Sequence, residues 1–397
     1  MKNDEHQAVT IFRKYLQIPS VHPDVNYDEC VKFLRSLAEE IGLPVEIIEI
    51  CAGKPIIIIT WLGQNPELPS ILLNSHMDVV PVYPDKWKYG PFSAEKDENG
   101  NIYARGAQDM KCVGIQYVEA IRRFKNEGLR FKRTIHITFV PDEEIGGEKG
   151  MAMFVKTEEF RKLNIGFALD EGIASETDEF HLFYAERSIW RLVIKFCGNA
   201  GHGSLLHENT AAEKLRYVVN KFLEYREKEK RRLNSNPELS IGDVTTINMT
   251  YIEGGVQMNV VPPEMMVGFD IRVAVDVDHQ QFHDLIESWC KEAGDDVHCD
   301  YRRKFPKLPP TSLDDKNPWW MAFKNAVDEM GLKVKPGVFP GGTDCRYIRP
   351  LGIPALGFSP MNNTPVLLHD HDEFLNENVF LRGIEVYYNV IKNLASV

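Results

Sequence analysis

Histidine and carboxylate side chains recur in short polar turns that directly follow apolar runs of this sequence. The turn PDEEIGG at 141–147 places Asp142, Glu143 and Glu144 in a row after the apolar run 134–140. Like charges at such short range raise one another's pKa unless a cation neutralises them. One carboxylate holding a metal ion beside a free carboxylate that takes a proton from water is also what metal-assisted hydrolysis needs. The turn indicates a hydrolytic metal site, and a solvated acidic turn is the alternative.

A second turn, SHMD at 75–78, follows the apolar run 71–74. A histidine at the end of a strand can bind a metal ion, and a carboxylate two residues later can orient its ring. We therefore expect His76 to be a ligand and Asp78 to hold its imidazole. A buried structural histidine is the alternative.

Three further segments carry side chains that bind metals: YARGAQDMK at 103–111, FALDEG at 167–172 and LHDHDE at 368–373. Asp109 in the first of them is also a common residue type for a helix N-cap. One histidine and one carboxylate for each of two ions, plus a shared carboxylate, form a coherent set of nitrogen and oxygen ligands. The residues alone leave two choices open, Asp170 or Glu171 and His369 or His371.

Strands and helices that would position these turns alternate through the first half of the chain. Helical periodicity covers 31–41 and 110–124. Apolar runs of strand length lie at 56–61, 71–74, 134–140 and 167–169. Continuous apolar strands separated by amphipathic helices predict an α/β fold with a mostly parallel sheet flanked by helices. Ligand sites gather at the carboxyl ends of the strands in such sheets, which is where the acidic turns fall.

The pattern of expected elements changes at residues 187–305, where strands and helices follow in the order β-α-β-β-α-β. The expected elements are 189–196, 211–233, 244–252, 267–273, 282–289 and 297–301. This order is the split ferredoxin-like unit, so we expect an inserted α+β domain at 187–305. Residues 1–186 and 306–397 would then form the other domain.

The composition restricts the classes of protein and partner. The 397 residues are 43% hydrophobic and 26% charged, with a formal net charge of −12. These values are typical of a packed globular protein and argue against nucleic acid or an anionic membrane as the main partner. The seven cysteines contain no CxxC pair, and no apolar leader or membrane-length run is present. Reduced thiols and a cytoplasmic location are the expectation.

The motifs together resemble the type 1 aminoacylases, in the wider di-zinc exopeptidase family that includes carboxypeptidase G and carnosinase. The segments that carry the resemblance span nearly the whole chain: SHMDVVP (75–81), YARGAQDMK (103–111), PDEEIGG (141–147), FALDEG (167–172), GHGS (201–204), GGTD (341–344) and NTPVLLHDHDE (363–373). PDEEIGG and RGAQDMK are the most specific of these.

The resemblance implies two zinc ions per subunit and a role for each of the acidic turns. The implied zinc ligands are His76, Asp109 and Glu171 for one ion, and Asp109, Glu144 and His369 for the other. Glu143 would be the general base and Asp78 would orient His76. Family members also carry a cis peptide bond after the bridging aspartate, here Asp109–Met110.

The resemblance makes the inserted domain a dimerisation domain. His202 would reach the active site of the partner subunit and stabilise the oxyanion, and Asn259, Arg272 and Gly342 would bind the substrate. Without the resemblance, His202 would be a loop histidine and Arg272 a solvated strand residue.

The expected activity is hydrolysis of small N-acyl-L-amino acids to a carboxylate and a free amino acid by a homodimer. A dipeptidase or carboxypeptidase of the same family is the main alternative, because the chemistry is identical and only the pocket differs. A binding protein without catalysis is the remaining one, although the full ligand set and the base are present.

Overall fold

The computed structural model describes residues 5–397. Most of the polar segment 1–6, for which the sequence predicts no leader, lies outside the described residues. The chain divides into two compact units. The first contains the chain up to Tyr184 with Thr311–Pro336 and Thr343–Val397, and the second contains Ala185–Pro310 with Gly337–Gly342. The sequence placed the boundaries at 186/187 and 305/306 and did not anticipate the short segment 337–342. Arg187 accounts for that segment, because its guanidinium donates to the carbonyl of Pro340 at 2.6 Å.

An eight-stranded sheet in the order β1-β2-β6-β3-β7-β16-β8-β15 organises the first unit. Its strands are β1 (Val45–Cys51), β2 (Lys54–Trp61), β3 (Ser70–His76), β6 (Ile135–Val140), β7 (Ile165–Asp170), β8 (Phe180–Glu186), β15 (Val334–Phe339) and β16 (Ala355–Phe358). The four central strands β6, β3, β7 and β16 run parallel. Antiparallel pairs flank them, because β1 pairs with β2, β2 with β6, and β8 with β16.

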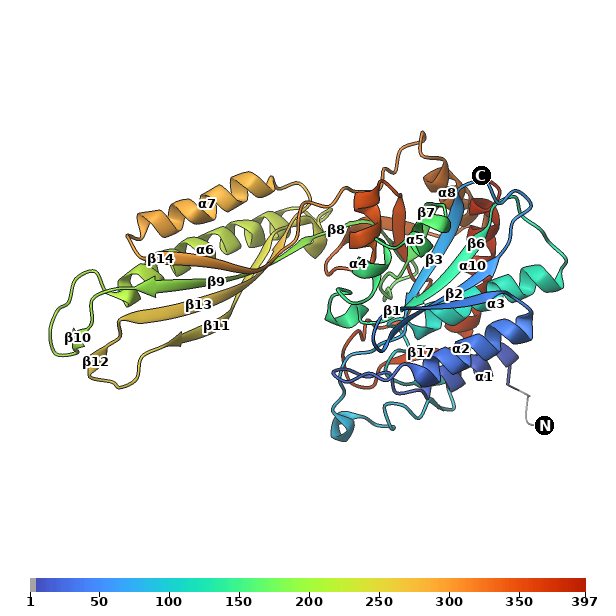
Figure 1. Ribbon diagram of the computed structural model, residues 1–397, viewed down its shortest axis with the longest axis horizontal. Helices are drawn as coiled ribbons and strands as arrows, with labels where there is room; N and C mark the ends of the chain where they lie inside the picture. The colour runs from blue at the N-terminus through green and yellow to red at the C-terminus, as the bar shows by residue number, and fades with distance from the viewer. Residues whose placement is uncertain (1–4) are drawn as a thin grey trace. The chain divides into compact units, whose positions relative to one another are not determined.

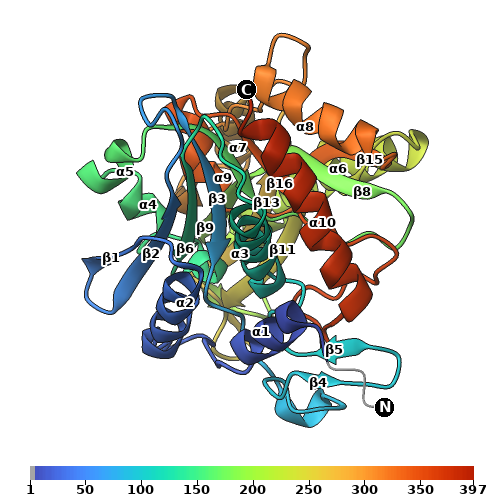
Figure 2. The same ribbon diagram turned by 90° about the vertical axis from the view of Figure 1, so that its right-hand side faces the viewer.

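Helices cover both faces of this sheet. The helices of one face are α1 (Gln7–Leu16), α2 (Asp28–Ile41), α3 (Lys111–Asn126), α8 (Pro318–Glu329) and α10 (Glu377–Leu394), and those of the other are α4 (Met151–Phe154), α5 (Glu158–Lys162) and α9 (Cys345–Ile348). Figure 2 shows α3 and α10 lying across the strands. Along β2, Ile57 and Ile59 enter one core and Ile56 and Ile58 the other, as the alternation of side chains along a strand requires. The predicted α/β fold is confirmed.

A small sheet lies beside the segment that carries Asp109. It consists of β4 (Glu95–Lys96), β5 (Asn101–Tyr103) and β17 (Phe374–Asn376), in the order β17-β5-β4. Short 3-10 turns occur at η1 (Pro84–Lys86), η2 (Glu143–Ile145), η3 (Ile241–Asp243) and η4 (Arg349–Leu351). The pairing of β17 with β5 brings the C-terminal part of the chain next to the segment before Asp109.

The second unit has the predicted order β-α-β-β-α-β. Its elements are β9 (Ser188–Cys197), α6 (Ala211–Ser235), β11 (Thr246–Gly254), β13 (Glu264–Val273), α7 (His279–Glu292) and β14 (Val297–Lys304). The antiparallel sheet runs β11-β13-β9-β14, and Figure 1 shows α6 and α7 on one of its faces. Phe222 of α6 stacks on Phe269 of β13 with 4.1 Å between the ring centroids, and both belong to the core of this unit.

A two-stranded ribbon of β10 (Gly201–His202) and β12 (Val260–Val261) extends the second unit. Among residues 5–397, no helix combines the length and apolar character needed to cross a membrane. All seven cysteines are free thiols.

Candidate metal centre

The acidic turns meet at one edge of the parallel sheet. Strand β3 ends at His76, β7 ends at Asp170 with Glu171 next in the chain, and β6 leads into the turn 141–147. Because β3 runs parallel to both β6 and β7, the carboxyl ends of the three strands lie together. This is the place where parallel sheets present ligand sites.

His76 faces two carboxylates. Its Nε2 lies 3.0 Å from Oδ1 of Asp109 and 3.6 Å from Oε2 of Glu171. All three side chains are buried. The three therefore form the first candidate ligand group.

His369 faces the other oxygen of the same aspartate. Its Nε2 lies 3.2 Å from Oδ2 of Asp109 and 3.0 Å from Oε2 of Glu144. The two oxygens of Asp109 thus point to different histidines, Oδ1 to His76 and Oδ2 to His369. This is the arrangement that a carboxylate shared by two ions requires.

The charges of this cluster are unbalanced without a cation. Burial raises the pKa of Glu144 to about 7, and the charge of Asp109 adds to this effect. Burial also raises the pKa of Glu171 well above its usual value, again with a contribution from Asp109. Hydrogen bonds to Asp109 and Glu144 raise the pKa of His369 to about 10. Within the described residues, Oε1 of Glu144 is buried and has no hydrogen-bond partner. The donor set therefore fits metal ions.

Glu143 lies beside this cluster with a different partner. A nitrogen of His76 and carboxylate oxygens of Glu143 and Glu171 lie within 4.8 Å of one another. Arg346 donates from Nη2 to Oε1 of Glu143 at 2.6 Å. Burial raises the pKa of Glu143 well above its usual value, although the charge of Arg346 opposes the shift. Arg346 is not among the predicted site residues, although it lies two residues after the GGTD segment at 341–344.

Asp78 contributes differently from the expectation. Its backbone oxygen lies 2.9 Å from Nδ1 of His76, whereas its carboxylate Oδ1 is 3.7 Å away. The carboxylate accepts the backbone N–H groups of Glu143 at 3.2 Å and Glu144 at 3.0 Å. It also pairs with Nε2 of the buried His22 at 2.8 Å. Asp78 thus holds the turn with its side chain and the His76 ring with its main chain.

The turn 141–147 has a second support at Asp142, which adopts a left-handed φ of 62°. Its Oδ1 accepts hydrogen bonds from the hydroxyl of Tyr27 at 2.8 Å and from Nζ of Lys54 at 2.7 Å. Of the three consecutive acidic residues, Asp142 therefore faces the protein, while Glu143 and Glu144 face the cluster.

The geometry separates the alternatives that the residues alone left open. Oδ1 of Asp170 accepts from Asn74 at 3.2 Å and its Oδ2 from the backbone N–H of Cys345 at 3.1 Å, so other partners engage both oxygens. The ring of His371 packs against Tyr83, with 6.1 Å between the centroids. Glu171 and His369 are therefore the members of each pair that reach the cluster. The Asp109–Met110 peptide bond is cis, as the resemblance implied.

The four remaining predicted residues lie in the second unit. His202 is in β10, and the backbone oxygen of the nearby Asn259 accepts from the N–H of Gly203 at 2.8 Å. Arg272 is in β13, where its Nε donates to Oδ1 of Asp270 at 2.7 Å. Gly342 ends the segment 337–342. His202 and Arg272 do not lie together within this unit.

Similarities to known proteins agree with this geometry. Residues 72–393 match peptidase family M20/M25/M40. Aminoacylase-1A of Rattus norvegicus is 56% identical over 393 residues, covering 99% of this chain and 96% of that protein. The M20 family metallo-carboxypeptidase Sso-CP2 from Sulfolobus solfataricus has the same fold, with a TM-score of 0.75, 18% identity and coverage of 98% of this chain and 100% of that chain.

A dinuclear metal-binding peptidase of the M20 family from Bacillus subtilis also shares the fold, with a TM-score of 0.69, 16% identity and 98% coverage of both chains. The fold, the clustered ligand groups and the match along most of the sequence lead to one assignment. The chain belongs to peptidase family M20/M25/M40.

Proposed function

We propose that this protein is a zinc-dependent amidohydrolase that cleaves N-acyl-L-amino acids to a carboxylate and a free amino acid. The observation that carries the proposal is the carboxylate of Asp109 between His76 and His369, with Glu143 beside this group. The identity with Aminoacylase-1A over nearly the whole chain supports the substrate class.

Two zinc ions per subunit suit the nitrogen and oxygen donors of this cluster. His76, Asp109 and Glu171 would hold one ion, and Asp109, Glu144 and His369 the other. Two observations support a cation here. The carboxylates are crowded, and Oε1 of Glu144 has no hydrogen-bond partner among residues 5–397. When bound, the zinc ions would supply an acidified water and positive charge at the carbonyl oxygen.

Glu143 is the proposed general base. It would accept the proton of the attacking water and pass it to the nitrogen of the leaving amine. The hydrogen bond from Arg346 keeps one oxygen of the carboxylate in place and leaves the other for the proton. Because Glu143 is not among the proposed zinc ligands, its removal should abolish turnover and leave metal binding intact.

A homodimer is part of the proposal, and the surface of the second unit supports it. Strand β11 lies at the edge of its sheet, and unpaired edges favour pairing with another chain. Exposed apolar side chains line this strand and the segments near the β10–β12 ribbon: Leu205, Leu206, Met249, Tyr251, Ile252, Val256, Met258 and Val260. Such a concentration on one unit is typical of a protein interface.

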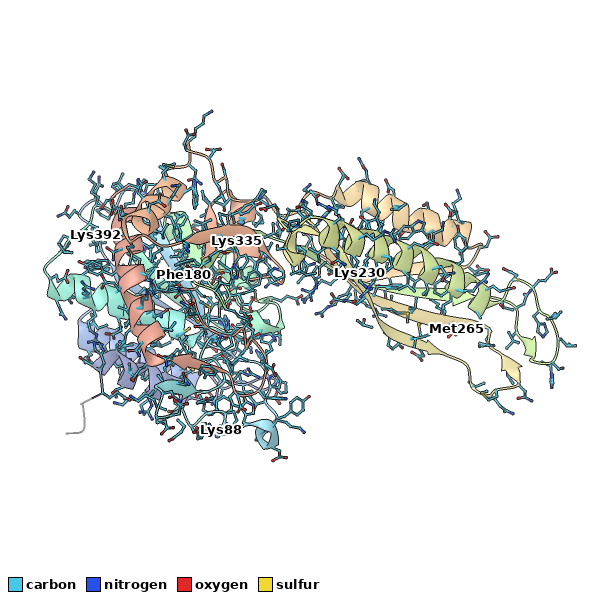
Figure 3. The ribbon with its side chains drawn as sticks, turned by 180° about the vertical axis from the view of Figure 1, so that it is seen from behind. Lys88, Phe180, Lys230, Met265, Lys335 and Lys392 are labelled. Atoms are coloured by element: carbon cyan, nitrogen blue, oxygen red, sulfur yellow. The ribbon has the colours of Figure 1, made fainter. Side chains whose placement is uncertain are left out.

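The positions of the substrate-binding candidates support a site shared between subunits. Glu264 and Arg272 lie near opposite ends of β13. Along the strand they are about 27 Å apart, at about 3.4 Å per residue. His202 lies in the ribbon next to the Glu264 end, the half that contains the labelled Met265 in Figure 3. His202 and Arg272 of one chain therefore cannot contact the same small substrate. If Arg272 binds the substrate, a partner subunit would therefore supply His202.

The cytoplasm is the proposed location, because seven free thiols suit a reducing compartment.

The substrate class is tested by turnover of N-acetyl amino acids against dipeptides with the same C-terminal residue, with a Glu143→Ala protein as the blank. We expect the N-acetyl compounds to have the higher kcat/KM. Preference for dipeptides would contradict the proposal and favour a peptidase of the same family.

A further inference from the structure

Two segments that are far apart in the sequence hold each other beside the metal centre. The segment 104–109 ends at Asp109, and the segment 365–374 contains His369. We call the hydrogen bonds between them the clasp. Their central residue is Glu373, whose side chain is fully buried.

Each carboxylate oxygen of Glu373 accepts two hydrogen bonds. Oε2 accepts from Nη1 of Arg105 at 2.7 Å and from the N–H of Gly106 at 3.1 Å. Oε1 accepts from the N–H of Gln108 at 2.6 Å and from the N–H of Asp109 at 3.2 Å. The second pair includes the main chain of the proposed bridging ligand itself.

The side chain of Gln108, in the segment 104–109, binds the main chain of the segment 365–374. Its Nε2 donates to the carbonyl oxygens of Pro365 at 3.0 Å and Phe374 at 2.9 Å, and its Oε1 accepts from the N–H of Leu367 at 3.1 Å. The segment with His369 is thus tied at both of its ends. This matters because His369 has a left-handed φ of 63°, a conformation that an L-residue rarely adopts unless its surroundings impose it.

We infer that Glu373 is a positioning residue that sets the relative places of Asp109 and His369 before metal ions bind. The inference rests on the proposed function, since it assumes that these two side chains are ligands. An ionised carboxylate has only acceptor atoms, so Glu373 can accept hydrogen bonds from all four donors that converge on it. A glutamine amide has one acceptor oxygen and one NH2 group, so its NH2 group would face two of these donors and repel them. Asp109 contacts Glu373 through its own main-chain N–H, and His369 lies between Leu367 and Phe374, which Gln108 holds. Repulsion between Glu373→Gln and two of the clasp donors would therefore displace both ligands.

The test compares Glu373→Gln with Glu377→Gln. Glu377 lies four residues later and pairs with Nζ of Lys96 at 2.8 Å, outside the clasp. Zinc is titrated into chelator-stripped full-length proteins by calorimetry, and cobalt(II) is added to separate samples for visible absorption. We expect E373Q to bind the metal about 10- to 100-fold more weakly, as loss of such a supporting partner does elsewhere, and to change the cobalt spectrum. E377Q should match the wild-type protein in both measurements.

A purely structural role predicts a different result, namely reduced thermal stability with unchanged metal affinity and cobalt spectrum. That result overturns the inference, as does an equal loss of affinity in E373Q and E377Q.

Gln108→Ala removes only the hydrogen bonds of the Gln108 side chain, so it keeps the inference testable if E373Q does not fold. It should weaken metal binding in the same direction by a smaller factor, and wild-type affinity in Q108A would then overturn the inference. Wild-type protein that binds no metal would overturn the proposed function as well, whereas two ions bound equally by wild type and E373Q would overturn this inference alone.

Discussion

The guanidinium of Arg346 donates a hydrogen bond of 2.6 Å to Glu143, and the two side chains are only 5% and 8% exposed. Arg346 also donates from Nε to the backbone oxygen of Thr343, which fixes the direction of the guanidinium. A buried carboxylate depends strongly on a charged hydrogen-bond partner for its orientation and its ionisation. This pair therefore controls the group that we propose as the base.

Glu143→Ala should retain both zinc ions and lose turnover by several orders of magnitude, because Glu143 takes a proton but binds no metal. Metal analysis and turnover of an N-acetyl amino acid on the same preparation would check this. Glu148→Gln, in an exposed position shortly after the same turn, should keep both properties. A metal-loaded Glu143→Ala protein with normal turnover would show that another group accepts the proton.

Arg346→Met should move the acidic limb of the kcat/KM profile to higher pH. Burial raises the pKa of Glu143 and the charge of Arg346 lowers it, so loss of the charge raises the pKa further. A base must be ionised to act, so activity would then require a higher pH. Arg346→Lys keeps the positive charge and should shift the limb less. Identical profiles for Arg346→Met and wild type would contradict the role of the pair.

Metal binding at pH 7 should release protons. Hydrogen bonds to Asp109 and Glu144 raise the pKa of His369 to about 10, so its imidazole should carry a proton at pH 7 and lose it on becoming a ligand. Calorimetric zinc titrations in two buffers of different ionisation enthalpy would measure at least about one proton released per subunit. His371→Ala should release the same number. A binding enthalpy independent of the buffer would contradict this prediction.

Activity should require residues from two chains. A His202→Ala protein and a Glu143→Ala protein would each be nearly inactive, since loss of one oxyanion donor costs roughly a hundredfold or more. After subunit exchange at equal amounts, heterodimers contain one site with both defects and one intact site, so about a quarter of wild-type activity should return. Turnover assays of the mixture, with heterodimer verified by differently tagged chains, would measure it. Verified heterodimer without recovery would place His202 in its own subunit's site or outside catalysis.

Local sequence pattern predicted the central part of the fold. Strands β3 and β6 are buried along their whole length, and this is why their continuous apolar runs identified them. The edge strand β1 was not anticipated, because its side chains are only half-buried or exposed and it has no continuous apolar run. Strand β8 was missed for a related reason, since two of its seven side chains are only partly buried.

The sequence by itself determined which turns end the parallel strands and which residue types they carry. His76, the pair Glu143 and Glu144, and the pair Asp170 and Glu171 were predicted as candidates because each follows an apolar run that specifies a strand. The tertiary structure decided the rest. Asp109 meets His369, Arg346 meets Glu143, and Glu373 receives the main chain of Asp109, all between segments far apart in the sequence. Local propensity acts over a few residues, whereas these contacts exist only after the sheet and its helices have packed.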